Sequence, residues 1–195
     1  MYAIIKRCFD IILSLLLLIL LSPLLMVIIL TIRLTSSGPA VFSQIRSGKN
    51  EKRFVIYKFR TMSMRAPDNV STENLTSSHR YITPVGKFLR QSSLDELPQL
   101  FNVLKGDMSF VGPRPVIPSE KILLALRRRN GASRVRPGIT GLAQIRGRDT
   151  LDVIAKSRYD ALYAHRCCFC LDIYILLHTV KCVLRREGIR EGHAE

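Results

Sequence analysis

A long apolar run near the N-terminus constrains this chain more than any other feature. No charged residue occurs from Ile11 to Ile32, and a stretch of that length meets the usual requirement for a transmembrane helix. Ser22 and Pro23 interrupt the run near its middle. Because proline lacks a backbone N–H and clashes with the preceding turn, the sequence predicts a helix that breaks at this point.

The basic residues that flank the run indicate how it sits in a membrane. Lys6 and Arg7 precede it, and Arg33 follows it. Basic clusters favour the cytoplasmic side, and a single span cannot place both of its ends there. A helix that enters the membrane, turns at the break and leaves by the same face can do so, with the Ser22 hydroxyl bonding a carbonyl freed by the break. We therefore expect residues 1–35 to form a re-entrant membrane hairpin. A kinked single-pass anchor is the alternative, and a cleaved signal peptide does not fit so long a run.

The remaining residues, 36–195, are enough for one compact domain with its own core. The chain has 30 Lys and Arg residues against 15 Asp and Glu residues, a net charge of +15. Such a balance suits an anionic bilayer surface, a nucleotide or phosphate substrate, or nucleic acid. The sequence has no Trp, no zinc-finger spacing and no basic stripe interleaved with aromatic residues, so we expect no nucleic-acid partner.

The five cysteines do not have the number or spacing of a disulfide framework. Three of them cluster at positions 167, 168 and 170, where a metal is conceivable. No second pair follows at zinc-ribbon spacing. We therefore expect reduced thiols in a cytosolic domain.

The secondary-structure pattern predicts a mostly helical α+β domain. Apolar residues within 41–45 and 54–57 have the character of two short strands, separated by a polar turn. Residues 65–80 are polar and predict a loop, and residues 135–148 are rich in Gly, Pro and Arg. Helices are expected at residues 84–90, 93–104, 119–129, 151–165 and 171–186. The last of these has an apolar face that suits either the core or a membrane interface.

Asp95 and Glu96 form an acidic pair at the start of one expected helix. Ser93 and Glu96 also fit an S-x-x-E capping box, so the local sequence by itself favours a capping role. Adjacent carboxylates can instead share a divalent cation, and one of them can attack phosphorus as a nucleophile. The helix dipole and Mg²⁺ would keep Asp95 ionised and stabilise an incoming diphosphate.

Several segments supply cations suited to phosphate. In the Gly-Pro-Arg-Pro motif at 112–115, two prolines fix the backbone around Arg114 and prepare its guanidinium for a bidentate phosphate contact. A rigid turn with a surface arginine is the plain alternative. Lys58, Arg60 and the segment 136–148 combine cations with backbone that can approach a ligand closely. Together with the acidic pair, they form the electrostatic arrangement that phosphoryl transfer needs.

Taken in order, these motifs resemble the bacterial sugar transferase family, and more narrowly its small monotopic phosphoglycosyl transferases. The resemblance covers almost the whole chain. The residues that carry it are Lys6, Arg7, Asp10, Ser22, Pro23, Gln44, Arg46, Gly48 and the segments 38–42, 58–62, 95–99, 112–115 and 136–141.

The resemblance implies a two-step reaction. A phospho-sugar would pass from a UDP-sugar to a polyprenyl phosphate such as undecaprenyl phosphate, and UMP would be released. Asp95 would attack the β-phosphate and form a covalent aspartyl-phosphosugar intermediate. Glu96 would help Asp95 to hold Mg²⁺. Arg114 would bind phosphate, and Lys58 and Arg60 would support charge in the active site. Contacts with the nucleotide sugar or the lipid phosphate would come from Arg136, Arg148 and Asp160.

The resemblance also implies a place in the cell. The catalytic domain would lie on the cytoplasmic face of the bacterial inner membrane, held by the re-entrant hairpin and by amphipathic interfacial helices in contact with lipid. It would prime capsule, exopolysaccharide, lipopolysaccharide or other glycoconjugate synthesis, and a homo-oligomer is compatible with that role. The alternatives are a membrane hydrolase that uses Asp95 and water, a glycosyltransferase that releases UDP, and a basic membrane-anchored binding module.

Overall fold

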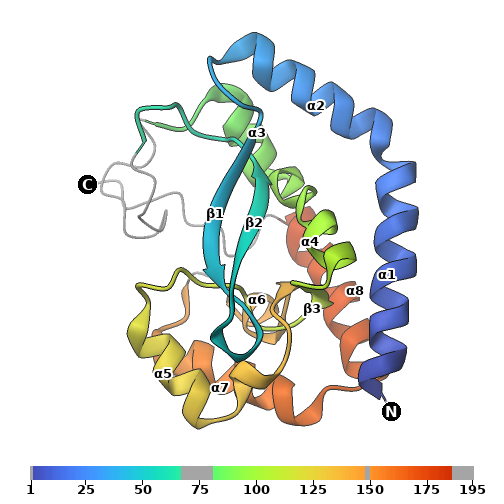
Figure 1. The fold of residues 1–195 in the computed structure, drawn as a ribbon, viewed down its shortest axis with the longest axis vertical. Coiled ribbons are helices and arrows are strands. Elements are labelled where there is room, and N and C mark those ends of the chain that lie inside the picture. Colours follow the sequence, from blue (N-terminus) through green and yellow to red (C-terminus); the bar gives the residue numbers. More distant parts are fainter. Residues whose placement is uncertain (1, 67–80, 148–149, 186–195) are drawn as a thin grey trace.

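The computed structural model describes residues 2–66, 81–147 and 150–185, and it has the expected mostly helical α+β architecture (Figure 1). Helices α1 (Tyr2–Leu20) and α2 (Ser22–Thr35) run along one side and across one end of the molecule. A hairpin of β1 (Val41–Ser47) and β2 (Arg53–Phe59) lies at its centre. The remaining elements in chain order are α3 (Pro84–Gln91), α4 (Gln99–Lys105), β3 (Ser109–Val111), α5 (Lys121–Arg129), β4 (Gly138–Thr140), α6 (Leu142–Ile145), α7 (Val153–Arg166) and α8 (Phe169–Arg185).

Helices α1 and α2 form a bent pair, with an angle of 62° at the predicted break. Neither helix alone is long and apolar enough to cross a membrane, whereas the bent pair meets both criteria together. The Ser22 hydroxyl donates to the carbonyl of Ile19 at 2.8 Å. That carbonyl would otherwise accept from the residue-23 N–H, which Pro23 lacks. The predicted role of Ser22 at the break is therefore confirmed.

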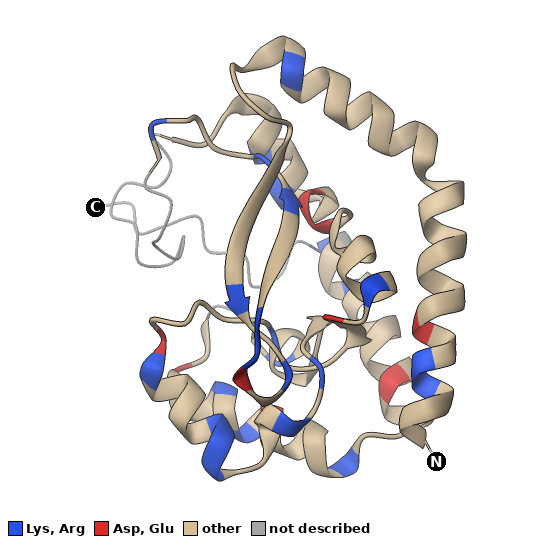
Figure 2. Cartoon of the chain, viewed as in Figure 1, with Lys and Arg blue, Asp and Glu red and all other residues tan. Residues whose placement is uncertain are grey.

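Polar contacts near the start of α1 fix the helix pair to the rest of the domain. Lys6 pairs with Asp172 of α8, and Arg7 donates to two backbone carbonyls at the end of α4, at 2.6 and 2.9 Å. The carboxylate of Asp10, 2% exposed, accepts bonds from a hydroxyl and a backbone N–H of β3 at 3.1 and 3.2 Å. Figure 2 shows that the charged bands of α1 lie near its N-terminal end, beside charged bands of the domain. The rest of the pair presents mainly apolar side chains.

Replacing Pro23 by Leu is expected to straighten the helix pair. The new N–H at position 23 can bond the Ile19 carbonyl, which removes the cause of the break. Ile4 and Leu30 are both exposed and accept spin labels once the native cysteines are replaced by serine. Electron-spin distance measurement should show the two labels moving apart by about 5 Å, given a rise of about 1.5 Å per residue. A Leu16→Ala control should leave the distance unchanged, and an unchanged distance in the Pro23 variant would contradict this account.

The β1–β2 hairpin confirms the two predicted strands, whereas the pairing of β3 with β4 was not predicted. β1 and β2 are antiparallel, with Val41 opposite Phe59 and Ser47 opposite Arg53. β3 and β4 pair in parallel, although each has three residues and they lie far apart in the sequence. The main core surrounds this pair; its buried members are Ile56, Leu100, Val103, Met108, Phe110, Val111, Leu142, Tyr163 and Ile175.

The capping box predicted at Ser93 and Glu96 is wrong. Ser93 adopts a left-handed backbone conformation, with φ of 56°, and its side chain makes no capping hydrogen bond. A single 3₁₀ turn, Leu94–Glu96, follows, and α4 begins only at Gln99. The left-handed residue and the 3₁₀ turn separate α3 from α4, so no helix begins at Ser93. The other expected helices are present, with ends shifted by one or two residues, and most of the expected loop at 65–80 lies outside the described residues.

Candidate active site

The acidic pair lies in the 3₁₀ turn between α3 and α4. Leu94 and Leu97, on either side of it, pack against a second buried cluster that includes Phe59 and Leu89. These apolar contacts hold the turn in place. The side chain of Glu96 is largely buried, whereas Asp95 is half-buried.

Glu96 is the meeting point of two predicted cations. Its Oε1 atom lies 2.8 Å from the Nζ of Lys58, on β2, and 3.1 Å from the NH2 of Arg114, in the loop after β3. Burial lowers the pKa of Lys58, and the attraction of Glu96 opposes that shift. The structure therefore brings together three of the segments that the sequence singled out.

Asp95 combines an unbonded carboxylate with an unusual pKa. Within the described part of the chain, no hydrogen bond reaches its side-chain oxygens. Burial raises its pKa, opposed by Lys58, and the negative charge of Glu96 raises it further. Positive charges on Arg90 and Arg114 also oppose the rise. A carboxylate of raised pKa that remains unengaged is well suited to nucleophilic attack once it is ionised.

Arg90 is a member of this site that the sequence analysis did not identify. It lies in the last turn of α3, and its Nε donates to the hydroxyl of Thr61 at 2.8 Å. That bond holds the guanidinium where its charge acts on Asp95. A basic residue in the helix turn just before the acidic pair was the available signal, but basic residues at helix ends are too common to single out.

Close backbone packing positions the loop that carries Arg114. The Gly112 N–H donates to the Thr140 carbonyl at 2.9 Å, and the Gly138 N–H donates to the Pro113 carbonyl at 3.0 Å. A Cβ atom added at Gly138 would lie 2.1 Å from the Gly112 nitrogen, so the two strands can approach this closely only with glycine there. The glycines of both motifs thus serve to place Arg114 beside Glu96.

Two other predicted site cations contact protein carbonyls. Arg60 donates to the carbonyl of Ser36 at 3.1 Å and to its hydroxyl at 2.8 Å, at the end of α2. Arg136 donates to the Gly106 carbonyl at 2.9 Å, at the end of α4 remote from the acidic pair. Neither has a contact with Asp95 or Glu96 within the described residues, and their contacts with substrate stay predictions.

Of the last two predicted residues, the structure describes Asp160 but not Arg148. Asp160 on α7 is buried and pairs with Arg127 of α5 at 2.7 Å. A direct contact of Asp160 with substrate stays a prediction. In the structure, Asp160 is connected to the site through Arg127, which also donates to the Arg114 carbonyl. Arg148 lies outside the described residues.

The acidic pair fits a magnesium ion better than a closed metal cage. Across the described ranges, no group of three or more His, Cys, Asp or Glu side chains could hold a metal, and the cysteines at 167–170 supply none. Mg²⁺ commonly uses one or two carboxylates and completes its shell with substrate phosphates and water. The oxygens of Asp95, which accept no hydrogen bond from the described residues, lie next to Glu96 and match that donor set.

The Asp95 carboxylate thus lies under the influence of three positive charges, those of Lys58, Arg90 and Arg114, in a domain that carries an apolar helix pair. The family model described as bacterial sugar transferase matches residues 1–186, and the chain belongs to that family. It is 45% identical over 182 residues to the UDP-glucose:undecaprenyl-phosphate glucose-1-phosphate transferase of Klebsiella pneumoniae, covering 90% of this chain and 39% of that protein.

Two further relatives support the same placement. The chain is 40% identical over 188 residues to the uncharacterized sugar transferase EpsL of Bacillus subtilis, and the match covers 96% of this chain and 91% of that protein. It is also 40%, over 198 residues, to the undecaprenyl-phosphate galactose phosphotransferase of Salmonella typhimurium, covering 94% of this chain and 41% of that protein. The chain thus spans about two-fifths of the length of the Klebsiella and Salmonella relatives, and nearly the full length of EpsL.

Proposed function

We propose that this protein transfers a phospho-sugar from a UDP-sugar to a polyprenyl phosphate, with release of UMP. The observation that carries the proposal is the convergence of Lys58 and Arg114 on Glu96, directly beside the carboxylate of Asp95 in the same turn. Membership of the sugar transferase family supports the reaction class, and the names of two relatives support undecaprenyl phosphate as the acceptor.

In the first step, a carboxylate oxygen of Asp95 attacks the β-phosphorus of the UDP-sugar. The bond from that phosphorus to the oxygen bridging the two phosphates breaks, and UMP leaves with the electron pair. The sugar phosphate remains on Asp95 as an acyl phosphate. Lys58, Arg90 and Arg114 stabilise the negative charge on the diphosphate as it redistributes.

In the second step, a phosphate oxygen of the polyprenyl phosphate attacks the same phosphorus. The bond to the Asp95 oxygen breaks, which releases the polyprenyl-diphosphate sugar and regenerates the carboxylate. Asp95 and Glu96 would hold Mg²⁺, which when bound neutralises diphosphate charge.

The bent helix pair gives this chemistry a location. We infer that α1 and α2 form a re-entrant hairpin in the bacterial inner membrane, because basic residues lie near both of its ends. Apolar side chains are also exposed on other helices, among them Phe101 of α4 and Leu177 and Val180 of α8. Contact of these helices with lipid would hold the active site at the headgroup plane on the cytoplasmic face, where the acceptor phosphate lies. The product would prime capsule, exopolysaccharide or lipopolysaccharide synthesis.

The test is nucleotide release by the full chain in lipid nanodiscs. The protein is given Mg²⁺, undecaprenyl phosphate and a panel of UDP-sugars, and nucleotides are separated by chromatography. UMP that appears for one donor and depends on the lipid phosphate supports the proposal. UMP with free sugar phosphate and no lipid dependence would indicate a hydrolase, and UDP would indicate a glycosyltransferase. No nucleotide from folded protein with any donor would overturn the proposal.

The loss of kcat/KM at acidic pH is expected to follow the protonation of Asp95. Attack requires the ionised carboxylate, and its raised pKa places the loss of kcat/KM on acidification above the ordinary range of an aspartate. The charge of Arg90 lowers this pKa, so Arg90→Gln should move the acid limb to higher pH, whereas Arg90→Lys should move it less. Lys87→Gln, at an exposed position of the same helix, is the control. An acid limb that stays in place in Arg90→Gln would contradict the assigned interaction.

A further inference from the structure

The Gly-Pro-Arg-Pro loop is held by donors from outside it at every carbonyl from Pro113 to Val116. The two prolines remove N–H groups, so the loop cannot pair with itself through them. The donors, in order along the loop, are the Gly138 N–H at 3.0 Å, the Arg127 guanidinium at 3.0 Å, the Arg46 guanidinium at 3.4 Å and the Ser47 N–H at 2.9 Å. The carbonyl of Arg114 itself accepts its hydrogen bond from a side chain of α5, that of Arg127.

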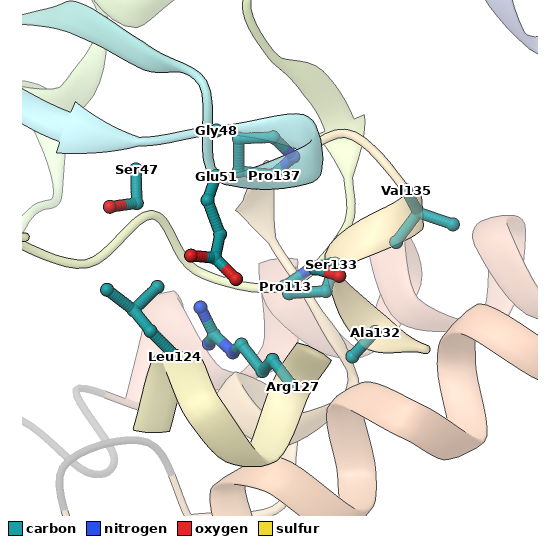
Figure 3. A pocket seen from close by; sticks show the side chains of 10 residues that line it. All are labelled: Ser47, Gly48, Glu51, Pro113, Leu124, Arg127, Ala132, Ser133, Val135 and Pro137. Carbon is teal, nitrogen blue, oxygen red and sulfur yellow. The ribbon is translucent and has the colours of Figure 1, made fainter. Parts of the chain in front are cut away.

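Arg127 connects that carbonyl to a buried carboxylate. Its NH1 donates to the Arg114 carbonyl, while its Nε and NH2 lie 2.8 and 2.7 Å from the Oδ2 of Asp160. Arg127 is 7% exposed and Asp160 is 2% exposed. Figure 3 shows Arg127 reaching from α5 into a pocket that Pro113 also lines. A planar guanidinium fixed along one edge by a carboxylate presents its remaining N–H group in one direction, here toward the loop.

We propose that Asp160 and Arg127 are positioning residues for Arg114: they hold its backbone so that its guanidinium lies against Glu96. The chain of contacts is continuous, from Asp160 to Arg127, to the Arg114 carbonyl and, through the Arg114 side chain, to Glu96 at 3.1 Å. The consequence for catalysis rests on the proposed function, in which Arg114 stabilises diphosphate charge. Asp160 then acts on the reaction without touching a substrate.

The test is a double-mutant cycle on UMP release. Asp160→Asn keeps the shape but weakens the hold on Arg127, so kcat/KM should fall roughly 10- to 100-fold at a temperature where the fold is intact. In an Arg114→Lys background the same change should have little further effect, because the group that it positions is already gone. Equal losses in both backgrounds would overturn the proposal.

A matched control lies on the same helix. Arg128 forms an exposed pair with Glu51 at 2.6 Å. Glu51→Gln breaks an arginine–carboxylate pair one residue away and should leave kcat/KM unchanged. If Asp160→Asn does not fold, the double variant Arg127→Gln, Asp160→Asn leaves no unpaired buried charge, and it should show the same loss because the guanidinium is absent.

A second readout does not depend on turnover. The Nε–H resonance of Arg114, observed by ¹⁵N NMR of the full chain, should shift in Asp160→Asn and stay in place in Glu51→Gln. If the wild-type protein released no UMP, the proposed function would fail while this comparison still decided the positioning role. An unshifted Arg114 resonance in Asp160→Asn would overturn the positioning role itself.

Discussion

Asp95→Asn is expected to abolish UMP release, with turnover falling by at least about 1,000-fold. The amide has nearly the same shape but cannot attack phosphorus, and no described carboxylate other than Glu96 lies in the same turn to replace it. Glu96 is itself engaged by Lys58 and Arg114. The loss is measured with the nanodisc assay and the preferred donor. Retained turnover in the variant would remove Asp95 from the role of nucleophile.

A trapping experiment separates loss of the nucleophile from loss of binding. Wild-type protein given a UDP-sugar labelled at the β-phosphate, without lipid acceptor, should release one equivalent of UMP and retain the label. Asp95→Asn should do neither. Glu120→Gln, at a half-buried acid whose side chain makes no cap contact at the start of α5, serves as the control and should behave as wild type. Label on the wild-type protein at a residue other than position 95 would contradict the assignment.

Gly138→Ala is expected to prevent stable folding. Its Cβ would lie 2.1 Å from the Gly112 nitrogen and 2.4 Å from the Thr140 carbonyl oxygen, both backbone atoms that cannot rotate away. We expect a loss of at least about 3 kcal/mol in the free energy of unfolding, in the range of severe core changes. Thermal unfolding of the purified chain, or its failure to accumulate in membranes, measures the effect.

Gly131→Ala provides the comparison for that variant. Gly131 has φ of 82°, so alanine there is strained, but its Cβ would have no neighbour closer than 3.6 Å. The expected cost is about 1 kcal/mol, from the left-handed backbone alone. Equal unfolding temperatures for the two variants would contradict the close crossing of β3 and β4 and, with it, the placement of Arg114.

The features that the sequence predicted correctly depend on local physics. The break at Pro23 follows from a missing N–H, and the Ser22 contact follows from the carbonyl that this leaves. The β1–β2 hairpin follows from two apolar stretches that flank a polar turn. Neither requires knowledge of the rest of the chain.

The features that the sequence missed depend on distant parts of the chain. β3 and β4 have three residues each and are stabilised by one another, so neither shows a strand pattern on its own. Ser93 carries a good capping signal, yet its backbone is left-handed, because it lies in the short segment that joins α3 to α4 and each of these helices is anchored in a buried cluster. Arg90 is oriented in the site by a hydrogen bond to Thr61, which lies 29 residues earlier in the chain.

The sequence by itself determined the chemistry available to this protein. The acidic pair, the phosphate-directed cations, the broken apolar run and the family all follow from residue types and their order, because charge and the backbone restrictions of proline are properties of single residues. Only the tertiary structure decided which cations serve the acidic pair. Lys58 and Arg114 reach Glu96, whereas Arg60 and Arg136 satisfy backbone carbonyls and Asp160 holds Arg127. A guanidinium can donate to a carbonyl, a carboxylate or a phosphate, so its partner in the protein is set by what the fold places within reach.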